Sequence, residues 1–329
     1  MFILVDAMGG DNAPKSNILG SIHAIQNASG FRIGLVGDEE VIKAELKQQG
    51  FTSDRLEIIH ASQVISTEDD PIKAVRNKRD SSIVVGMKRI KEKSADVFLS
   101  AGDTGALMVA GRLFVKTIPG ISRPALPALI PAKKGHVLLI DAGSNTICTP
   151  ENLLQFAKMG SVYFESVMQV EKPTVGLLNV GTEDRKGPPE IRETFEKLSQ
   201  SGLHFVGNIE GRDVVSGDIN VVVCNGFVGN IVLKFFEGSA KLVFGEVVAV
   251  LKSGIVNKVC ALLLKNDLKK RVKRYDYQAL GGTLLFGYNG YLIKCHGSST
   301  EQAIECSILK AAKLPQSDLL QRLKAEFKK

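Results

Sequence analysis

Short apolar runs that end in glycine beside a polar residue recur along this chain of 329 residues. The clearest run is 221–224, Val-Val-Val-Cys, whose composition is typical of a buried strand. A loop containing Gly226 and Gly229 is expected at 225–230, before a helix that carries Lys234. Such a loop points backbone N–H groups and the positive end of the helix dipole at one place, where an anion can bind. A single loop of this kind is more often an ordinary strand-to-helix turn, so the argument depends on its repetition.

The order of strand, short loop and helix is repeated throughout the chain. Ten strands are predicted, at 2–5, 32–36, 56–60, 96–99, 125–130, 137–140, 174–180, 204–206, 221–224 and 290–295. Strands that alternate with helices are typical of a mostly parallel sheet with helices on both faces. No linker rich in proline, glycine or serine divides the chain. We predict one catalytic domain, 1–329, that is a three-layer α/β/α sandwich with a mixed, mostly parallel sheet of about ten strands.

Parallel strands place their carboxyl ends at one edge of a sheet, where ligands bind. At six predicted strand ends, glycine stands beside an amide, a hydroxyl or a charged group. The candidate phosphate- or substrate-binding residues are Gly9, Gly10, Asp11, Ser100, Gly102, Asp103, Thr104, Gly105, Asn145, Asn225, Gly226, Gly229, Ser298 and Ser299. Glycine allows a backbone to approach a ligand, and serine, threonine and asparagine donate hydrogen bonds to anionic oxygens. Lys186 or Lys234 would add positive charge, so the pattern predicts an anion-binding crevice.

His296, which precedes Gly297-Ser298-Ser299, is either a general acid or base or a structural histidine. The fingerprints of dinucleotide-binding proteins, P-loop proteins and serine hydrolases are missing from the sequence. The five cysteines are scattered, which indicates neither a disulfide framework nor a zinc site. We therefore expect no metal and no cofactor, and we interpret Cys224 as a small core residue.

The net charge of +7 and the pI of about 9.0 favour acidic partners. The basic residues are not interleaved with aromatic residues, which argues against nucleic acid. The amino terminus resembles no signal peptide, and no apolar stretch is long enough for a membrane span, so we expect a cytoplasmic protein.

One segment, 240–274, interrupts the alternation with two apolar helices and no strand. Its last ten residues, 265–274, hold six basic residues, including Lys269, Lys270 and Arg271, and one acidic residue. A helical hairpin of this composition can lie on an anionic membrane or pack across a subunit interface. Both interpretations stay open, and they are compatible.

Eight segments in order carry a family resemblance: Asp-Ala-Met-Gly-Gly-Asp-x-x-Pro at 6–14, Pro-x-x-Ala-Val-Arg at 71–76, and the segments 100–107, 123–125, 154–160, 177–187, 220–238 and 296–299. Together they resemble the bacterial phosphate acyltransferases of phospholipid synthesis, the PlsX family. The resemblance implies a fold similar to those of isocitrate dehydrogenase and the phosphotransacetylases, usually as a homodimer. It also implies that acyl-acyl carrier protein and inorganic phosphate react to give acyl phosphate. A membrane glycerol-phosphate acyltransferase would then use this product.

Phosphate is itself a nucleophile, so the protein has to position it, stabilise an oxyanion and assist the departing thiolate. The residues expected to serve in catalysis are Lys186, His296 and Asn230. Arg76, Lys78 and Arg79 are expected to receive the acidic carrier protein, and Lys269, Lys270 and Arg271 to contact lipid. We expect peripheral membrane association.

The chain departs from the family pattern at four positions. Asp103 replaces asparagine, Asn220 and Asn225 replace aspartate, and Ile147 replaces an acidic residue. We hypothesise that Asp103 and Asn225 are neighbours whose exchange keeps the number of carboxylates unchanged. The alternatives are a phosphate acetyl- or butyryltransferase that uses acyl-coenzyme A, a dehydrogenase of the same fold, and an inactive scaffold at the membrane surface.

Overall fold

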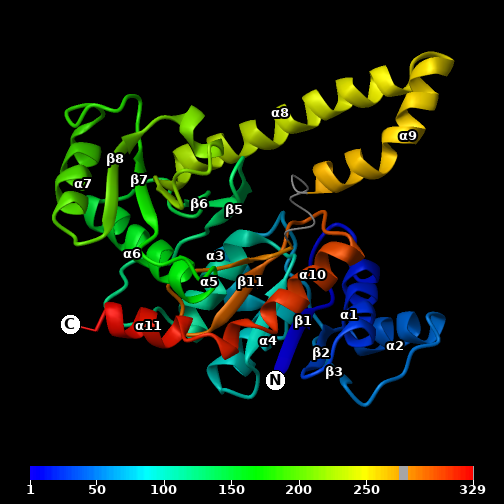
Figure 1. Ribbon diagram of the computed structural model, residues 1–329. Helices are drawn as coiled ribbons and strands as arrows, with labels where there is room; N and C mark the ends of the chain where they lie inside the picture. Colours follow the sequence, from blue (N-terminus) through cyan, green and yellow to red (C-terminus); the bar gives the residue numbers. More distant parts are fainter. Residues whose placement is uncertain (274–280, 329) are drawn as a thin grey trace.

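A computed structural model describes residues 1–273 and 281–328, with the backbone alone for 265, 266 and 268–273. Its strands form two sheets (Figure 1). The larger has the order β10 (Thr283–Leu284), β11 (Tyr291–Lys294), β4 (Val97–Ser100), β1 (Phe2–Asp6), β2 (Arg32–Gly37), β3 (Leu56–His60). The smaller has the order β5 (Ala128–Pro131), β6 (His136–Ile140), β9 (Val221–Val223), β7 (Thr174–Leu178), β8 (His204–Ile209).

The prediction of one sheet of about ten strands was therefore wrong, although the mostly parallel pairing is confirmed. Among the strands that the structure describes, β10–β11 and β5–β6 pair antiparallel and all other pairs are parallel. The edge strands β10 and β5 both line a cavity between the two sheets. Outside the strands, two isolated antiparallel β-bridges pair Ala125 with Phe286 and Thr117 with Tyr288.

Helices cover both faces of the larger sheet, as a three-layer sandwich requires. One face packs against α1 (Lys15–Asn27), α2 (Glu39–Gln48) and α10 (Glu301–Ala311), and the other against α3 (Pro71–Asn77), α4 (Ser82–Lys91) and α5 (Thr104–Ala110). The smaller sheet packs against α6 (Pro150–Ser166), α7 (Pro189–Ser199) and, on its other face, the start of α8 (Gly226–Lys252). The body of the molecule also contains four shorter helices. These are the π-helix η1 (Gly111–Val115), the 3₁₀ helices η2 (Gly211–Val215) and η4 (Leu314–Gln316), and the α-helix α11 (Leu319–Glu326).

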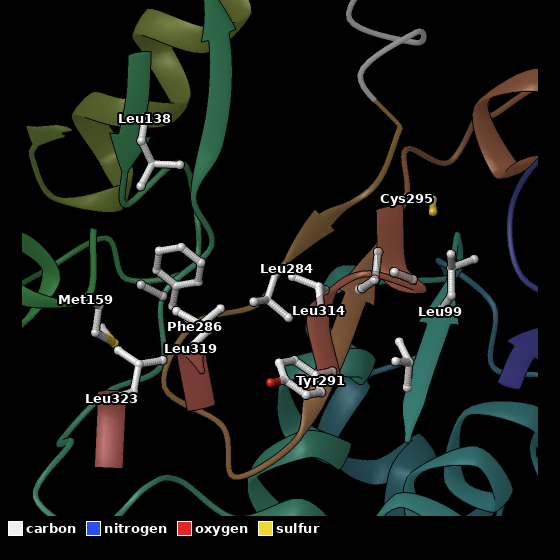
Figure 2. Close-up of a cluster of buried hydrophobic side chains, with 14 of the residues drawn as sticks. Leu99, Leu138, Met159, Leu284, Phe286, Tyr291, Cys295, Leu314, Leu319 and Leu323 are labelled. Atoms are coloured by element: carbon white, nitrogen blue, oxygen red, sulfur yellow. The ribbon is translucent and has the colours of Figure 1, made fainter. Parts of the chain in front are cut away.

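One hydrophobic core continues from sheet to sheet. It joins Leu99 of β4 to Leu138 of β6 through Leu284 and Phe286, all at most 9% exposed (Figure 2). Because burial of such side chains stabilises by roughly 1.5–3 kcal/mol each, this shared core fixes the two sheets relative to each other.

A long helix, α8 (Gly226–Lys252), leaves the body of the molecule, and α9 (Gly254–Lys273) turns back from its far end (Figure 1). The predicted loop at 225–230 was wrong, because Asn225 caps the helix and residues 226–230 form its first turns. The segment predicted from 240 is likewise the outer part of α8, not a separate helix. Within the described residues, no single helix has the length and apolar composition to cross a membrane; α8 and 254–264 pass such a test only as a pair bent by 116°.

Candidate functional site

The carboxyl ends of β1 and β4 are joined through two buried side chains. Ser100 Oγ donates to Asp6 Oδ2 at 2.6 Å and accepts from the backbone N–H of Gly102 at 3.0 Å. Burial raises the pKa of Asp6, although the bond from Ser100 opposes this. The hydroxyl proton of Ser100 is therefore engaged inside the protein, where it orders the 100–105 loop.

The loops after β1 and β11 are also bonded to each other. The N–H of Asp11 donates to the oxygen of Gly297 at 2.8 Å, and the Asn12 amide donates to the oxygens of Ser298 and Ser299. Gly10 has a φ of +101°, a left-handed conformation that favours glycine. The structure thus places the predicted residues Gly10 and Asp11 next to the loop that holds Ser298 and Ser299.

Asn17, which the sequence analysis missed, anchors the first of these loops. Its side-chain N–H₂ group lies 2.8–3.2 Å from the backbone oxygens of Asp6, Ala7 and Gly9. An asparagine among the small and apolar residues on one face of the first helix was the available signal. Because buried polar groups need partners, such a residue indicates a structural contact.

On the smaller sheet, Asp141 organises the loop that follows β6. Its two carboxylate oxygens accept hydrogen bonds from the N–H groups of Leu126, Gly143, Ser144 and Asn145 and from the Ser144 and Asn145 side chains. Asn145 also donates to Pro124, and its own backbone oxygen accepts from Gly226 at 2.7 Å. The start of α8 is therefore seated on the 141–145 loop.

A cavity of about 370 Å³ lies between the two sheets. Its polar lining includes Thr104 from α5, Asn230 and Lys234 from α8, and Lys294, His296 and Ser299 from β11 and the loop that follows it. Its apolar lining includes Leu129, Leu138, Tyr163, Leu233, Leu284 and Phe286. Three predicted groups of residues, around Thr104, Asn230 and His296, thus line the same cavity. One part of its lining is polar and another part is apolar.

The tautomer of His296 follows from its partners. The N–H of Ser298 donates to His296 Nδ1 at 3.2 Å, so in the neutral ring Nδ1 is the acceptor and Nε2 holds the proton. Ser298 Oγ also lies 2.8 Å from Nδ1. Burial, and then the nearby positive charge of Lys234, lower the pKa of His296. The ring is therefore held as a neutral Nε2–H donor.

The two family departures at Asp103 and Asn225 have separate explanations. Asp103 Oδ1 caps α5 by accepting from the N–H of Ala106 at 2.7 Å, and Asn225 Oδ1 caps α8 by accepting from Val228 at 2.9 Å. Among the described hydrogen bonds, none joins the two side chains. Since aspartate and asparagine are comparable helix caps, each replacement is tolerated where it stands.

The other two departures lie away from the cavity lining. Asn220 precedes β9, at the amino end of the strand, and accepts from the N–H of Thr174 at 2.9 Å. Ile147 is 81% exposed.

The structure does not bring the predicted lysine, Lys186, to the lining of this cavity. It lies in the loop after β7, half exposed, with Nζ 3.8 Å from Glu183 Oε1. Lys234 does line the cavity and pairs with Glu237 at 2.9 Å.

The predicted basic residues at the end of α3 and directly after it differ in their contacts. Lys78 is engaged by Asp69 at 2.6 Å and by the oxygen of Val64, whereas Arg76 and Arg79 are exposed. α3 adjoins the site, because a β-carbon on Gly105 would lie 2.9 Å from Pro71 Cγ. Lys269, Lys270 and Arg271 fall in α9, where the side chains lie outside the described residues.

A search of residues 1–273 and 281–328 finds no group of three or more histidine, cysteine, aspartate or glutamate side chains placed to hold a metal ion. The groups that line the cavity are an imidazole, an amide, hydroxyls, lysines and the carboxylate of Glu237.

Known proteins similar to this chain carry consistent descriptions. Residues 1–322 match a family model described as fatty acid synthesis protein. A phosphate acyltransferase of Caldicellulosiruptor saccharolyticus is 47% identical over 329 residues, with 99% of this chain and 98% of the relative covered. One from Acetivibrio thermocellus is 44% identical over 327 residues, with 99% and 96% covered.

Among solved structures, a phosphotransacetylase from Streptococcus pyogenes superposes with a TM-score of 0.63 at 18% identity, covering 96% of this chain and 94% of that one. The EutD phosphotransacetylase from Staphylococcus aureus gives 0.58 at 16% identity, covering 95% and 94%. At these identities the likeness establishes the fold alone.

Proposed function

Because the chain belongs to the phosphate acyltransferase family and is thus an acyltransferase, we propose that it makes acyl phosphate from acyl-acyl carrier protein and inorganic phosphate. This membership confirms the family expected from the sequence motifs. One observation supports the assignment to this site most directly: the inter-sheet cavity places an imidazole N–H donor, an amide and a lysine beside an apolar lining. Phosphate and a thioester carbonyl require the polar part, and an acyl chain requires the apolar part.

The reaction needs no nucleophile from the protein. An oxygen of hydrogen phosphate attacks the thioester carbonyl carbon, the carbon–sulfur bond breaks, and the proton released by phosphate goes to the thiolate. The products are acyl phosphate and the free thiol. The protein contributes by holding the reactants together and by stabilising the charge on the carbonyl oxygen.

Within the cavity, His296 donates from Nε2 to the developing oxyanion, and the amide of Asn230 donates to a second oxygen of the reacting group. Both groups are held by the protein before substrate arrives: His296 by Ser298, and Asn230 by the seating of α8 on the 141–145 loop. Donors fixed in this way need no reorganisation when charge develops. Lys186 remains a proposed catalytic cation, which would act from the neighbouring loop.

We assign the carrier-docking role to the exposed Arg76 and Arg79, since α3 abuts the start of α5, which holds Thr104. An acidic carrier protein would bind this basic face and deliver its thioester to the cavity. The alternative donor, acyl-coenzyme A, would need no such face.

For α8 and α9 we propose two surfaces. Phe227, Ile231 and Phe235, all more than half exposed at the start of α8, would pair with a second copy of the chain. Ile255, Val256, Leu262 and Leu263 of α9, 71–82% exposed and followed by the basic run, would contact an anionic membrane at its cytoplasmic side. The acyl phosphate would be released close to a membrane glycerol-phosphate acyltransferase.

One experiment distinguishes the candidates. The full chain is incubated with either acyl-acyl carrier protein or acyl-coenzyme A, with and without inorganic phosphate, and the phosphate-dependent formation of acyl phosphate and free thiol is measured. Product from the carrier protein alone, or at much lower donor concentration, is the expected result. Preference for coenzyme A would favour the short-chain transferase, and no product from either would favour the inactive scaffold.

A further inference from the structure

A lysine that the sequence analysis did not single out is part of the cavity. Lys294 is the last residue of β11, and side chains alternate along a strand. Tyr291 and Ile293 face the core shared by both sheets, whereas Leu292 and Lys294 face the side of α4 and α5. The ammonium group therefore lies between the 100–105 loop and the cavity, next in sequence to Cys295 and His296.

The ammonium group has two known acceptors. Lys294 Nζ donates to the backbone oxygen of Cys295 at 2.5 Å and to that of Ala101 at 3.3 Å. A lysine ammonium carries three N–H donors. Because the side chain lines the cavity, the third donor is available to an acceptor inside it.

The charge of this group lacks a close counter-ion. Among the described residues, no carboxylate oxygen lies within 4.0 Å of Lys294 Nζ, although Lys234, Lys186 and Lys78 each have one. Burial lowers the pKa of Lys294, and the more distant Asp103, Asp6 and Asp11 act against that change. A largely buried ammonium with only backbone oxygens as partners is costly, and an anion in the cavity would offset this cost.

We propose that Lys294 binds the phosphate substrate directly, through its third N–H and its charge. This deepens the proposed function, on which it rests, by assigning the cation that holds phosphate beside His296. The bonds to Ala101 and Cys295 fix the ammonium in place, so its position is set before phosphate arrives. In this arrangement Thr104 supplies a further donor to the same anion.

The test measures phosphate binding without turnover. Isothermal titration with inorganic phosphate is carried out on the full chain, on Lys294→Gln, on Lys294→Arg and on Lys313→Gln, an exposed lysine after α10. We expect the glutamine variant to lose about ten- to hundredfold in phosphate affinity, as for loss of a charge-assisted hydrogen bond. Lys294→Arg keeps the charge and should lose less, and Lys313→Gln should match the unchanged chain.

Steady-state kinetics then distinguishes direct phosphate binding by Lys294 from a role that is limited to holding the 100–105 loop in place. Direct contact raises KM for phosphate in Lys294→Gln and leaves KM for the acyl donor unchanged. Unaltered phosphate affinity, equal losses in the glutamine and arginine variants, or equal increases in both KM values would overturn the proposal. Phosphate binding to the unchanged chain without any acyl phosphate formation would instead count against the proposed function alone.

Discussion

A β-carbon added to Gly229 would overlap the backbone oxygen of Asp141 and would lie 2.9 Å from the sulfur of Cys224. The first turns of α8 therefore rest directly on the loop that follows β6. Gly229→Ala should push the helix outward and destabilise the protein by about 1–3 kcal/mol, as overpacking does. It should also displace Asn230 and lower kcat. Urea unfolding and acyl phosphate formation measure the two effects.

Gly238 and Gly245 of α8 offer matched controls, because a β-carbon at either would meet nothing within 4 Å. Alanine there should stabilise the helix by roughly 0.5–1 kcal/mol and leave kcat unchanged. Equal behaviour of all three alanine variants would show that the contact with Asp141 does not position α8.

The cap at Asn225 gives a second prediction. Asn225→Ala removes the acceptor for the N–H of Val228 and should cost about 1 kcal/mol of unfolding free energy. Asn225→Asp keeps the acceptor and adds a charge that favours the helix start, so its stability should equal or exceed that of the unchanged chain. Chemical denaturation of both variants provides the measurement. A destabilised aspartate variant would mean that a second requirement at this position excludes the carboxylate.

The pKa of His296 should respond to Lys234. Burial is the larger cause of its lowered pKa, and the positive charge of Lys234 is the next. Lys234→Gln removes that charge and releases Glu237 from its ion pair, and both changes favour imidazolium. The pKa should therefore rise, yet stay below the usual value of about 6.5, because burial persists. Titration of the imidazole proton resonances by NMR measures it, and a pKa that falls or does not move would contradict the assigned causes.

Lys186→Ala tests the cation predicted from the sequence. Its side chain is 49% exposed and its pairing with Glu183 is long, so the free energy of unfolding should change by less than about 1 kcal/mol. If Lys186 contacts the reacting phosphate, kcat/KM should fall about 100-fold or more. Glu183→Gln is the control, with near-normal activity expected. Near-normal turnover in Lys186→Ala would remove the residue from the mechanism.

The α9 surface can be tested with liposomes. Replacing Leu262 and Leu263, 71% and 78% exposed, with aspartate removes apolar area and adds negative charge. Sedimentation with anionic vesicles should then drop strongly while the thermal unfolding temperature stays the same. Val41→Asp, at an exposed apolar position on α2, should leave sedimentation unchanged. Undiminished binding of the double variant would assign membrane contact elsewhere, or to none of the chain.

The sequence predicted the strands well where they are long and buried. Ten predicted strands correspond to observed ones, because short runs rich in apolar and β-branched residues favour strands over helices. β10 was missed, since a strand of two residues, 283–284, leaves no period to detect. The division into two sheets was missed for a related reason: it depends on which edges pair, and edge pairing is a tertiary property that alternation does not encode.

The candidate site was likewise predictable in part. Glycines and polar residues at strand ends were predictable, because parallel sheets gather those ends. Whether a polar group faces a ligand or the protein was not predictable. Ser100 and Asn145 proved to be engaged by Asp6 and Asp141, whereas Lys294, a lysine at the end of an apolar strand, lines the cavity.

Because α8 is one continuous helix, its outer end and Asn230 in the cavity belong to the same rigid element. Its 27 residues span about 40 Å, and Asn230 lies near the end that rests on the 141–145 loop. A swing of roughly 10° about the Asn225 end would carry the outer tip about 7 Å but shift Asn230 by only about 1 Å. Displacements of that smaller size suffice to alter reaction rates about 100-fold. Any movement at the outer end of the helix would therefore reach the reacting groups with a much smaller amplitude, yet one still large enough to change the reaction rate.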